Sequence, residues 1–279
     1  MIIEPMATGL ARQWDLGEVL VDTHTDYQHL VIAHTAQGIS LFCDDDRQST
    51  EFSQLTYHEA LMVPAFLLAD RLERVLIVGS SEGVVCQMAV DAGATQVDHV
   101  DIDEEAVRLC AEHLPYGYIP DQLAAAESGD GPIRMWFTDG YQYIRDTAER
   151  YDVVVVDLPD EREGEAQHNR LYGPEFLGLC RDLLRPGGVF VSQAGCQTLW
   201  RNTTLIRMWQ RFHQVFDTVA YYGSDEHEWA YLFGRADSVT DPTALMVERL
   251  PALPYQPQTI DALALRGNAI APLRVRRAG

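Results

Sequence analysis

Two acidic residues, Asp157 and Asp160, lie three positions apart and directly follow four consecutive valines at 153–156. Such a continuous apolar run is typical of a strand that is buried on both faces, and the end of that strand would aim Asp157 at a ligand crevice. Amines are protonated at neutral pH, so an enzyme that uses an amine as a nucleophile needs carboxylates that bind the cation and accept its proton. The pair is well suited to both tasks. In a purely structural interpretation, Asp157 ends the strand and Asp160 caps a turn.

A second group of residues has the spacing of a nucleotide site. The apolar segment 75–78 is followed at once by the turn Gly79-Ser80-Ser81-Glu82-Gly83 and then by a helical pattern. Glycines permit a tight turn and let a nucleotide approach the backbone, and N–H groups are unpaired at the start of a helix. The turn alone is a weak signal, because many ordinary turns share it.

Acidic residues also end the next two predicted strands. Asp101-Ile102-Asp103 follows the turn at about the 20-residue distance where Rossmann-like folds place a carboxylate on ribose hydroxyls. Asp139-Gly140 ends the third strand. Any one of these acids could simply cap the helix that follows it. Three of them in register favour a nucleotide-type ligand at the carboxyl edge of a sheet.

The elements that would position these residues alternate between strand and helix patterns from residue 74 onward. Predicted strands cover 74–79, 96–103, 133–140, 151–160 and 188–195, with helical patterns between them. A long helix over 200–216 precedes two strands, 217–222 and 229–234, that are close enough to pair as a hairpin. We therefore expect an α/β, Rossmann-like methyltransferase fold: a mostly parallel seven-stranded sheet with a terminal antiparallel hairpin.

The N-terminal part has a different pattern. Short β-like runs at 17–21, 29–35 and 38–42 predict a small meander, and a helix is expected over 57–69 although Pro64 lies inside it. We expect two domains, an N-terminal β-strand domain (1–56) and the Rossmann-like transferase domain (57–279). The Pro- and Leu-rich tail after residue 241 should wrap the surface without forming a domain of its own.

The composition excludes several functions. The formal net charge is −21, and all 21 basic residues are arginine. Without lysine there is no Walker A lysine and no Schiff base, hence no pyridoxal phosphate chemistry, and a basic face for nucleic acid is not expected. An acidic surface could attract a small cationic substrate, although acidity also serves solubility.

Cysteine spacing and hydropathy argue against a metal site, a disulfide framework and a membrane protein. The five cysteines form no C-x-x-C pair, so we expect neither a zinc site nor a disulfide framework, and no metal. No apolar stretch reaches the roughly 18 residues that a membrane helix needs, and the acidic N-terminus is unlike a signal peptide. The sequence thus predicts a cytoplasmic protein with no membrane partner.

Eight segments in unbroken order between residues 20 and 235 resemble the spermidine synthase (polyamine aminopropyltransferase) family, a branch of the class I S-adenosylmethionine-dependent transferases. They are 25–28 (TDYQ), 47–51 (RQSTE), 57–59 (YHE), 74–83 (RVLIVGSSEG), 100–103 (VDID), 138–140 (TDG), 157–160 (DLPD) and 187–195 (GGVFVSQAG). Each is modest alone, but together they are specific.

The resemblance implies roles for particular residues. Asp157 would be the proton acceptor, with Tyr57 and Asp160 holding a small cationic amine. The donor, decarboxylated S-adenosylmethionine or S-adenosylmethionine itself, would be lined by Gln28, His58, Gly79, Glu82, Gly83, Asp101, Asp139 and Gly140. Most spermidine synthases have aspartate where Glu82 stands, whereas thermospermine and agmatine or triamine aminopropyltransferases tend to have glutamate. The resemblance also implies a homodimer or homotetramer.

Departures from the family pattern leave alternatives open. Ser80 and Ser81 replace two glycines, Glu161 replaces the proline that usually follows the position of Asp160, and an acidic pair is replaced by Ser53 and Gln54. Serine hydroxyls could bind a donor carboxylate, so an N-methyltransferase that uses intact S-adenosylmethionine is the second hypothesis. A non-enzymatic polyamine or nucleotide sensor is the third.

Several points stay undecided at this stage. Tyr57 and His58 could be packing residues at the start of a helix. Trp229 and Tyr222 could stack on an amine or belong to the core. The identity of the acceptor amine and the role of the loop 161–170 are not predicted.

Overall fold

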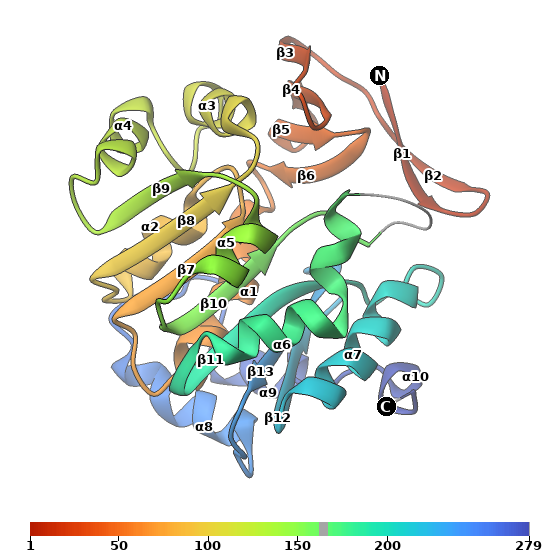
Figure 1. Ribbon diagram of the computed structural model, residues 1–279. Helices are drawn as coiled ribbons and strands as arrows, with labels where there is room; N and C mark the ends of the chain where they lie inside the picture. Colours follow the sequence, from red (N-terminus) through yellow and green to blue (C-terminus); the bar gives the residue numbers. More distant parts are fainter. Residues whose placement is uncertain (162–166, 279) are drawn as a thin grey trace.

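The seven-stranded sheet forms the centre of the computed structural model, which describes residues 1–161 and 167–278. Its order is β12-β13-β11-β10-β7-β8-β9 (Figure 1). The strands are β7 (Arg74–Gly79), β8 (Gln96–Asp101), β9 (Ile133–Phe137), β10 (Tyr151–Asp157), β11 (Leu184–Cys196), β12 (Thr218–Gly223) and β13 (Trp229–Arg235). Strands β11, β10, β7, β8 and β9 pair in parallel, and β13 pairs antiparallel with both β11 and β12. The predicted fold class is confirmed.

Helices cover both faces of this sheet. The helices are α1 (Gln54–Leu68), α2 (Val84–Asp91), α3 (Glu104–His113), α4 (Pro120–Ser128), α5 (Gly140–Asp146), α6 (Pro174–Asp182), α7 (Thr203–Val215), α8 (Pro242–Arg249), α9 (Ala262–Asn268) and α10 (Leu273–Arg276), with short 3-10 turns η1 (Gln167–Tyr172) and η2 (Leu250–Ala252). Along β10, Val153 and Val155 pack in the core with α1 and α2, whereas Val154 and Val156 pack with α6 and α7. The unbroken valine run thus reflects a strand with apolar layers on both sides.

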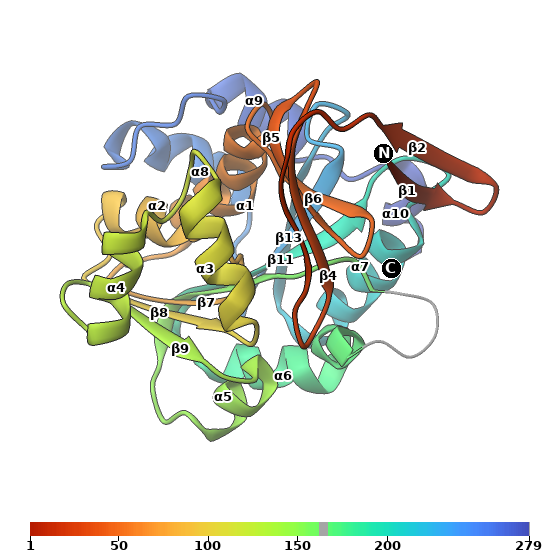
Figure 2. The same cartoon turned by 90° about the horizontal axis from the view of Figure 1, so that it is seen from above.

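The N-terminal part consists of two small antiparallel sheets. The meander β3 (Val19–His24), β4 (His29–Thr35), β5 (Gly38–Cys43) and β6 (Asp46–Thr50) has its strands in sequence order. Figure 2 shows it beside the carboxyl-edge loops of the large sheet, while the hairpin β1 (Ile2–Ala7) and β2 (Leu10–Trp14) projects away from it. The sequence did not predict this hairpin, because its fully buried Glu4, which accepts a hydrogen bond from Trp14 Nε1 at 2.7 Å, breaks the apolar pattern.

The C-terminal tail closes over α1. Glu59 of α1 is completely buried, and its carboxylate accepts hydrogen bonds from Tyr255 Oη (2.9 Å), Gln258 N (2.7 Å) and both the backbone N and Oγ1 of Thr259 (2.6 Å each). The tail also contributes Met246, Leu253, Ile260 and Leu265 to the core that contains α1. It therefore packs against α1 and fixes the helix that carries Tyr57 and His58.

Among the helices of the described ranges, none combines the length and apolar character required to cross a lipid bilayer.

Candidate active site

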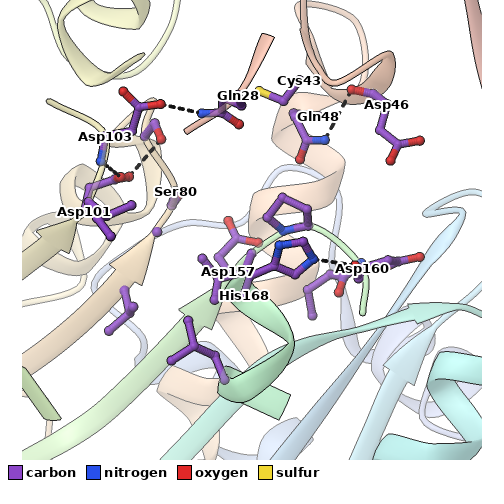
Figure 3. Close-up of a pocket in the computed structure, with 18 of the residues that line it drawn as sticks. Gln28, Cys43, Asp46, Gln48, Ser80, Asp101, Asp103, Asp157, Asp160 and His168 are labelled. Carbon is purple, nitrogen blue, oxygen red and sulfur yellow. Dashed lines mark hydrogen bonds between the residues drawn. The ribbon is translucent and has the colours of Figure 1, made fainter. Parts of the chain in front are cut away.

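A cavity of about 380 Å³ lies where the carboxyl ends of β7, β8 and β10 face the meander. Ten of the eleven predicted site residues line it: Gln28, Tyr57, His58, Gly79, Glu82, Asp101, Asp139, Gly140, Asp157 and Asp160. Figure 3 shows Asp101 and Asp103 at one end of the close-up, Asp160 at the other and Asp157 between them. The parallel sheet thus brings acids from separate strand ends to one crevice.

The eleventh residue, Gly83, is not among the cavity-lining residues that the structure describes. It is the N-cap residue directly before α2 and has a φ of 76°, and a Cβ added to it would lie 2.4 Å from the ring of Tyr118. Glycine is required at position 83 by the turn conformation and by the aromatic ring packed against it.

The glycine turn joins the ends of two strands. Gly79 has a φ of 82°, and a Cβ there would lie 2.2 Å from the carbonyl oxygen of Asp157. Ser80 N donates to that same oxygen at 3.1 Å, and Ser80 itself has a φ of 63°. A left-handed serine costs roughly 1–2 kcal/mol relative to its preferred conformations. The turn is therefore held in a strained form against the strand that carries Asp157.

A buried histidine lies beneath this turn. His99 Nε2 donates to the carbonyl oxygen of Gly79 at 2.9 Å, and its Nδ1 accepts a hydrogen bond from Tyr118 Oη at 3.0 Å. Burial lowers the pKa of His99 to about 4, so the ring is neutral near pH 7. Sequence reasoning missed this support, since a lone histidine in a strand gives no signal of its partners.

Asp101 has the environment of a carboxylate that accepts hydroxyl protons. It is 7% exposed, its Oδ2 accepts a hydrogen bond from Ser81 Oγ at 2.8 Å, and its Oδ1 accepts one from the backbone N of Asp103 at 2.9 Å. Burial raises its pKa to about 6, and the hydrogen bonds oppose that rise. Asp101 is thus mainly ionised at pH 7 and faces the cavity.

Asp103 links the two parts of the chain. It caps α3 by accepting from Ala106 N at 3.0 Å, and its other oxygen accepts from Thr25 Oγ1 (2.6 Å) and Gln28 Nε2 (2.9 Å). The capping interpretation is thus correct for Asp103, but the residue also places the predicted Gln28 at the cavity. This second role was not predicted, because it depends on a contact across 75 residues.

Asp139 likewise caps a helix and lines the cavity. Its Oδ1 accepts hydrogen bonds from Tyr141 N (2.9 Å) and Gln142 N (3.2 Å) at the start of α5, and its Oδ2 is paired with Arg170. Gly140 follows, where a Cβ would lie 2.4 Å from Val78 Cγ1. A glycine is therefore needed for α5 to begin this close to β7.

Asp157 is held by Tyr57. The Tyr57 hydroxyl donates to Asp157 Oδ1 at 2.6 Å, which makes Tyr57 a site residue as well as a packing residue on α1. Burial raises the pKa of Asp157 to about 7, the Tyr57 hydrogen bond lowers it, and the nearby Glu82 carboxylate raises it further. A group with this pKa can both release and accept a proton near neutral pH.

Asp160 lies at the opposite end of the cavity from Asp101. Gln193 Nε2 donates to its Oδ1 at 2.6 Å, and its backbone oxygen accepts from His168 Nε2 at 3.0 Å. Burial raises the pKa of Asp160, whereas Gln193 and Arg201 oppose the rise. Gln193 lies in the segment 187–195 that carried the family resemblance, but neither it nor Arg201 was predicted as a site residue.

Glu82 is the least satisfied carboxylate of the site. It is 8% exposed and lines the cavity, and within the described residues no hydrogen bond or ion pair to its side chain is found. Its negative charge raises the pKa of Asp157 and of Asp101. A buried carboxylate without a protein partner is costly, so this position favours a ligand that brings a cation or a hydrogen-bond donor.

The structure also places the residues whose role the sequence left undecided. Among the aromatic residues, Trp229 lines the cavity, whereas Tyr222 is fully buried in the core. His58 lines the cavity, and burial lowers its pKa. Part of the loop 161–170 lies outside the described residues; of the rest, Glu161 is bound by Arg207 and Arg211 at 3.0 Å.

The fold and site together define a Rossmann-like nucleotide-binding transferase with an acidic active-site cavity. The sequence profile of the spermine/spermidine synthase domain matches residues 54–224. The chain belongs to the spermine/spermidine synthase family, and the predicted resemblance and enzyme class are confirmed.

Curated relatives agree with this assignment. The chain is 33% identical over 234 residues to polyamine aminopropyltransferase 2 of Hyperthermus butylicus, covering 82% of this chain and 74% of the relative. It is 29% identical over 279 residues to a polyamine aminopropyltransferase of Synechococcus sp. (strain JA-2-3B'a(2-13)), covering 93% and 86%.

Solved structures agree on the fold. A spermidine synthase in complex with the transition-state analogue AdoDATO superposes with a TM-score of 0.83 at 19% identity, covering 99% of this chain and 94% of that one. The spermidine synthase of Thermotoga maritima gives a TM-score of 0.82 at 19% identity, covering 99% and 93%.

Proposed function

We propose that this chain transfers an aminopropyl group from decarboxylated S-adenosylmethionine to a small amine. The observation that carries the proposal is the position of Asp157, which lines the cavity at the end of β10 with a pKa of about 7 and a hydrogen bond from Tyr57. Relatives at 29–33% identity are named polyamine aminopropyltransferases, which supports the same chemistry.

The proposed reaction is a single displacement. The nitrogen lone pair of the acceptor attacks the aminopropyl carbon next to the sulfonium, a C–N bond forms, and the C–S bond breaks. The thioether leaves with the electron pair as neutral methylthioadenosine. Because this leaving group needs little activation, the protein must mainly align a neutral amine and remove its proton. Asp157 accepts that proton, while Tyr57 orients the carboxylate and Asp160 binds the amine end of the acceptor.

The donor would be bound by the remaining residues that line the cavity. Asp101, ionised near neutral pH, would accept hydrogen bonds from the ribose hydroxyls, and Asp139, Gly140, Gln28 and His58 would line the rest of the nucleoside. Glu82 supplies a carboxylate, unpaired within the part of the chain that the structure describes, for the free ammonium of the aminopropyl chain.

Glu82 also separates the two donor hypotheses. Intact S-adenosylmethionine carries a carboxylate beside its amine, and Glu82 would repel that group. Ser81 Oγ, one of the two serine hydroxyls expected to bind a donor carboxylate under the N-methyltransferase hypothesis, already donates to Asp101 at 2.8 Å. The comparisons favour aminopropyl transfer over the N-methyltransferase alternative.

The experiment is a methylthioadenosine-release assay on purified protein with decarboxylated donor and a panel of amines. We expect release with at least one amine, and loss of at least about a hundredfold in kcat when Asp157 is changed to Asn. Calorimetry should show tighter binding of the decarboxylated donor than of S-adenosylmethionine. No release with any amine, or tighter binding of the intact donor, would contradict the proposal. Donor binding without any turnover would favour the sensor hypothesis.

The proposal extends to the remaining sequence predictions. We place the enzyme in the cytoplasm as a homodimer or homotetramer, divided into an N-terminal β-strand domain (1–56) and a transferase domain (57–279). Size-exclusion chromatography with light scattering tests the oligomeric state.

A further inference from the structure

The arginines that line the cavity within the described ranges are each paired with a carboxylate. The pairs are Arg170 with Asp139, Arg201 with Asp160 at 3.8 Å, and Arg47 with Glu228 at 2.6 Å. Asp139 and Asp160 are themselves lining residues, whereas Glu228 is not among the lining residues that the structure describes. The partner of Arg47 therefore lies outside the lining of the cavity.

Glu228 connects two parts of the chain at this wall. It directly precedes Trp229, the first residue of β13, which lines the cavity. Its Oε2 accepts a hydrogen bond from Arg47 Nη2 of β6, and its Oε1 accepts one from Arg12 Nη2 of β2, both at 2.6 Å. Glu228 also has a φ of 65°, a left-handed conformation that is unfavourable for a residue with a Cβ. One carboxylate in a strained backbone position thus binds two guanidinium groups of the N-terminal sheets.

The two arginines depend on Glu228 to different degrees. Arg12 has a second carboxylate, because its Nη1 lies 3.4 Å from Glu4 Oε2, and its side chain is 35% exposed. The side chain of Arg47 is only 7% exposed, and within the described ranges it forms an ion pair with Glu228 alone. Its other side-chain hydrogen bond there, to Ser53 Oγ, is long at 3.4 Å, and its Nε has none. Arg47 therefore relies on Glu228 to balance its charge.

Arg47 lies within electrostatic reach of the proposed proton acceptor. Tyr231 is completely buried, and its ring centre lies 5.3 Å from that of Tyr57, whose hydroxyl donates to Asp157. Burial raises the pKa of Tyr231 well above its usual value, the charge of Asp157 raises it further, and the charge of Arg47 lowers it. Arg47 and Asp157 thus act on the same buried side chain.

A cationic amine and a released arginine would compete for the same carboxylates. The ammonium groups of the acceptor are expected at Asp157 and Asp160, and a guanidinium binds carboxylates through a fork of two hydrogen bonds. Arginine stays protonated in proteins, so it cannot give way by losing its charge. Glu228 is also charged near pH 7: burial raises its pKa, but the hydrogen bond from Arg12 and the charges of the surrounding arginines bring it below its usual value.

We propose that Glu228 is a positioning residue that holds Arg47 away from Asp157 and Asp160, so that an amine with two or more cationic nitrogens can occupy those carboxylates. This inference rests on the proposed aminopropyl transfer and names a residue that controls the affinity for its acceptor. Glu228 acts through Arg47 and does not itself contact the amine.

The test measures methylthioadenosine release by Glu228→Gln. The acceptor is whichever of agmatine, 1,3-diaminopropane, 1,4-diaminobutane and spermidine gives the highest kcat/KM in the parent. The variant releases Arg47, so the KM for this acceptor should rise by at least about tenfold. The kcat at saturating acceptor and the Kd for decarboxylated S-adenosylmethionine, measured by calorimetry, should stay within about threefold of the parent values, because the chemistry and the donor end are unchanged.

Removal of the competing arginine should reverse the effect. In the double variant Arg47→Met, Glu228→Gln, the KM for the same acceptor should return to within about threefold of the parent value, since no released guanidinium remains. Arg47→Met alone should stay in the same range. A purely structural role of Glu228 predicts the opposite, because the double variant still lacks the ion pair between β6 and the start of β13.

Glu226→Gln is the matched control for net charge. Glu226 is exposed in the turn before β13 and is not among the described lining residues. Its replacement should leave the KM at the parent value. If Glu228→Gln does not fold, as judged by thermal unfolding, Glu228→Asp carries the same prediction and the same reversal, because its side chain is too short to bridge both guanidinium groups.

The outcomes separate this inference from the proposed function. If the parent releases methylthioadenosine but the KM is unchanged in Glu228→Gln, or is raised and not restored in the double variant, the role of Glu228 is wrong and aminopropyl transfer stands. The same holds if the affinity for the donor falls as much as the affinity for the acceptor. If the parent releases no methylthioadenosine with any amine, the proposed function itself fails, and the inference with it.

Discussion

At the residue scale, the site combines a proton acceptor with a neutral hydrogen-bond donor. Asp157 has a pKa of about 7 because burial disfavours its charge, and the 2.6 Å hydrogen bond from Tyr57 limits that effect. Ionised Asp157 is the form that can accept a proton. We therefore expect kcat/KM of the parent to rise with pH through about 7.

Replacement of Tyr57 by Phe should move this pH dependence. Without the hydroxyl, the charged form of Asp157 loses a hydrogen bond, so the pKa of Asp157 should rise by roughly 0.5–1 pH unit. The acid limb of the kcat/KM profile should shift to higher pH by the same amount. The measurement is a pH series with saturating donor. Tyr222→Phe, a core tyrosine outside the cavity lining, is the control and should leave the limb in place. An unshifted limb in Tyr57→Phe would separate Asp157 from the observed ionisation.

The buried, ionised form of Asp157 should lower the free energy of unfolding at high pH. Its pKa is about 7 in the folded state and 3.8 in the reference state, so the folded protein binds this proton more tightly than the unfolded chain does. The stability associated with this group is present below pH 4 and is lost as the pH rises to about 7. Asp157→Asn, although inactive, should therefore be about 2–4 kcal/mol more stable than the parent at pH 8.

Urea unfolding at pH 4 and pH 8 measures this difference. The gain in unfolding free energy of Asp157→Asn over the parent should be present at pH 8 and close to zero at pH 4. A variant that is less stable than the parent at pH 8 would mean that the charged carboxylate is stabilised by its surroundings.

At the scale of elements, the strand ends position the site, and turns hold the strand ends. The start of α2 illustrates this, because Gly83 has a φ of 76° and lies against the Tyr118 ring. Gly83→Ala should cost about 2–4 kcal/mol of unfolding free energy, from backbone strain and from overpacking together. It should also weaken donor binding, since Ser80, Ser81 and Glu82 precede it in the same turn.

Gly129→Ala is the matched control. Gly129 ends α4 with a φ of 73°, and a Cβ there would meet no atom within 4 Å. Its replacement should therefore cost only the backbone strain, roughly 1–2 kcal/mol. Urea unfolding gives the stabilities and calorimetry the donor affinity. Equal losses of unfolding free energy in Gly83→Ala and Gly129→Ala would show that the contact with Tyr118 does not contribute to the cost.

Elements with a uniform apolar signal could be predicted from the sequence. The valines at 153–156 identified β10, and the acids after each strand identified Asp101, Asp139 and Asp157 because parallel strands end at one edge. The hairpin β1–β2 was missed because of its buried Glu4. The helix α4 was missed because its short sequence, PDQLAAAES, buries only Leu123 and Ala126 and has little amphipathic pattern.

The proposed acceptor end of the site could not be predicted for a different reason. Its members come from β6, β11, the β11–α7 connection and β13, which no local spacing relates. The pairing of Arg201 with Trp229 or of Gln193 with Asp160 exists only once the sheet has formed. Sequence patterns predict which edge of a sheet binds a ligand, whereas they say little about the wall contributed by distant loops.

At the scale of the whole molecule, the net charge of −21 should affect catalysis and stability in opposite directions. A strongly negative protein attracts cationic substrates, and salt screens that attraction. We expect kcat/KM for an amine acceptor to fall by about tenfold between low salt and 0.5 M sodium chloride. The same salt should raise the midpoint of thermal unfolding, because it also screens repulsion among the acidic groups.

Sucrose at equal osmolality is the control, since it leaves charge–charge interactions unscreened. It should not reproduce the loss of kcat/KM. A kcat/KM that is independent of salt would mean that acceptor capture depends on the cavity alone and not on the field of the protein.

The hydrogen bonds between Glu59 and Thr259 join positions 200 residues apart. A ribosome makes the chain from the N-terminus, so the partner of Glu59 emerges about 200 residues after Glu59 itself. Until then, the Glu59 carboxylate lacks both these donors and the tail residues that cover it, and the packing of the helix bearing Tyr57 and His58 is incomplete. The helix is thereby completed only after residue 259 has been made, and a nascent chain truncated before residue 255 is expected to remain inactive.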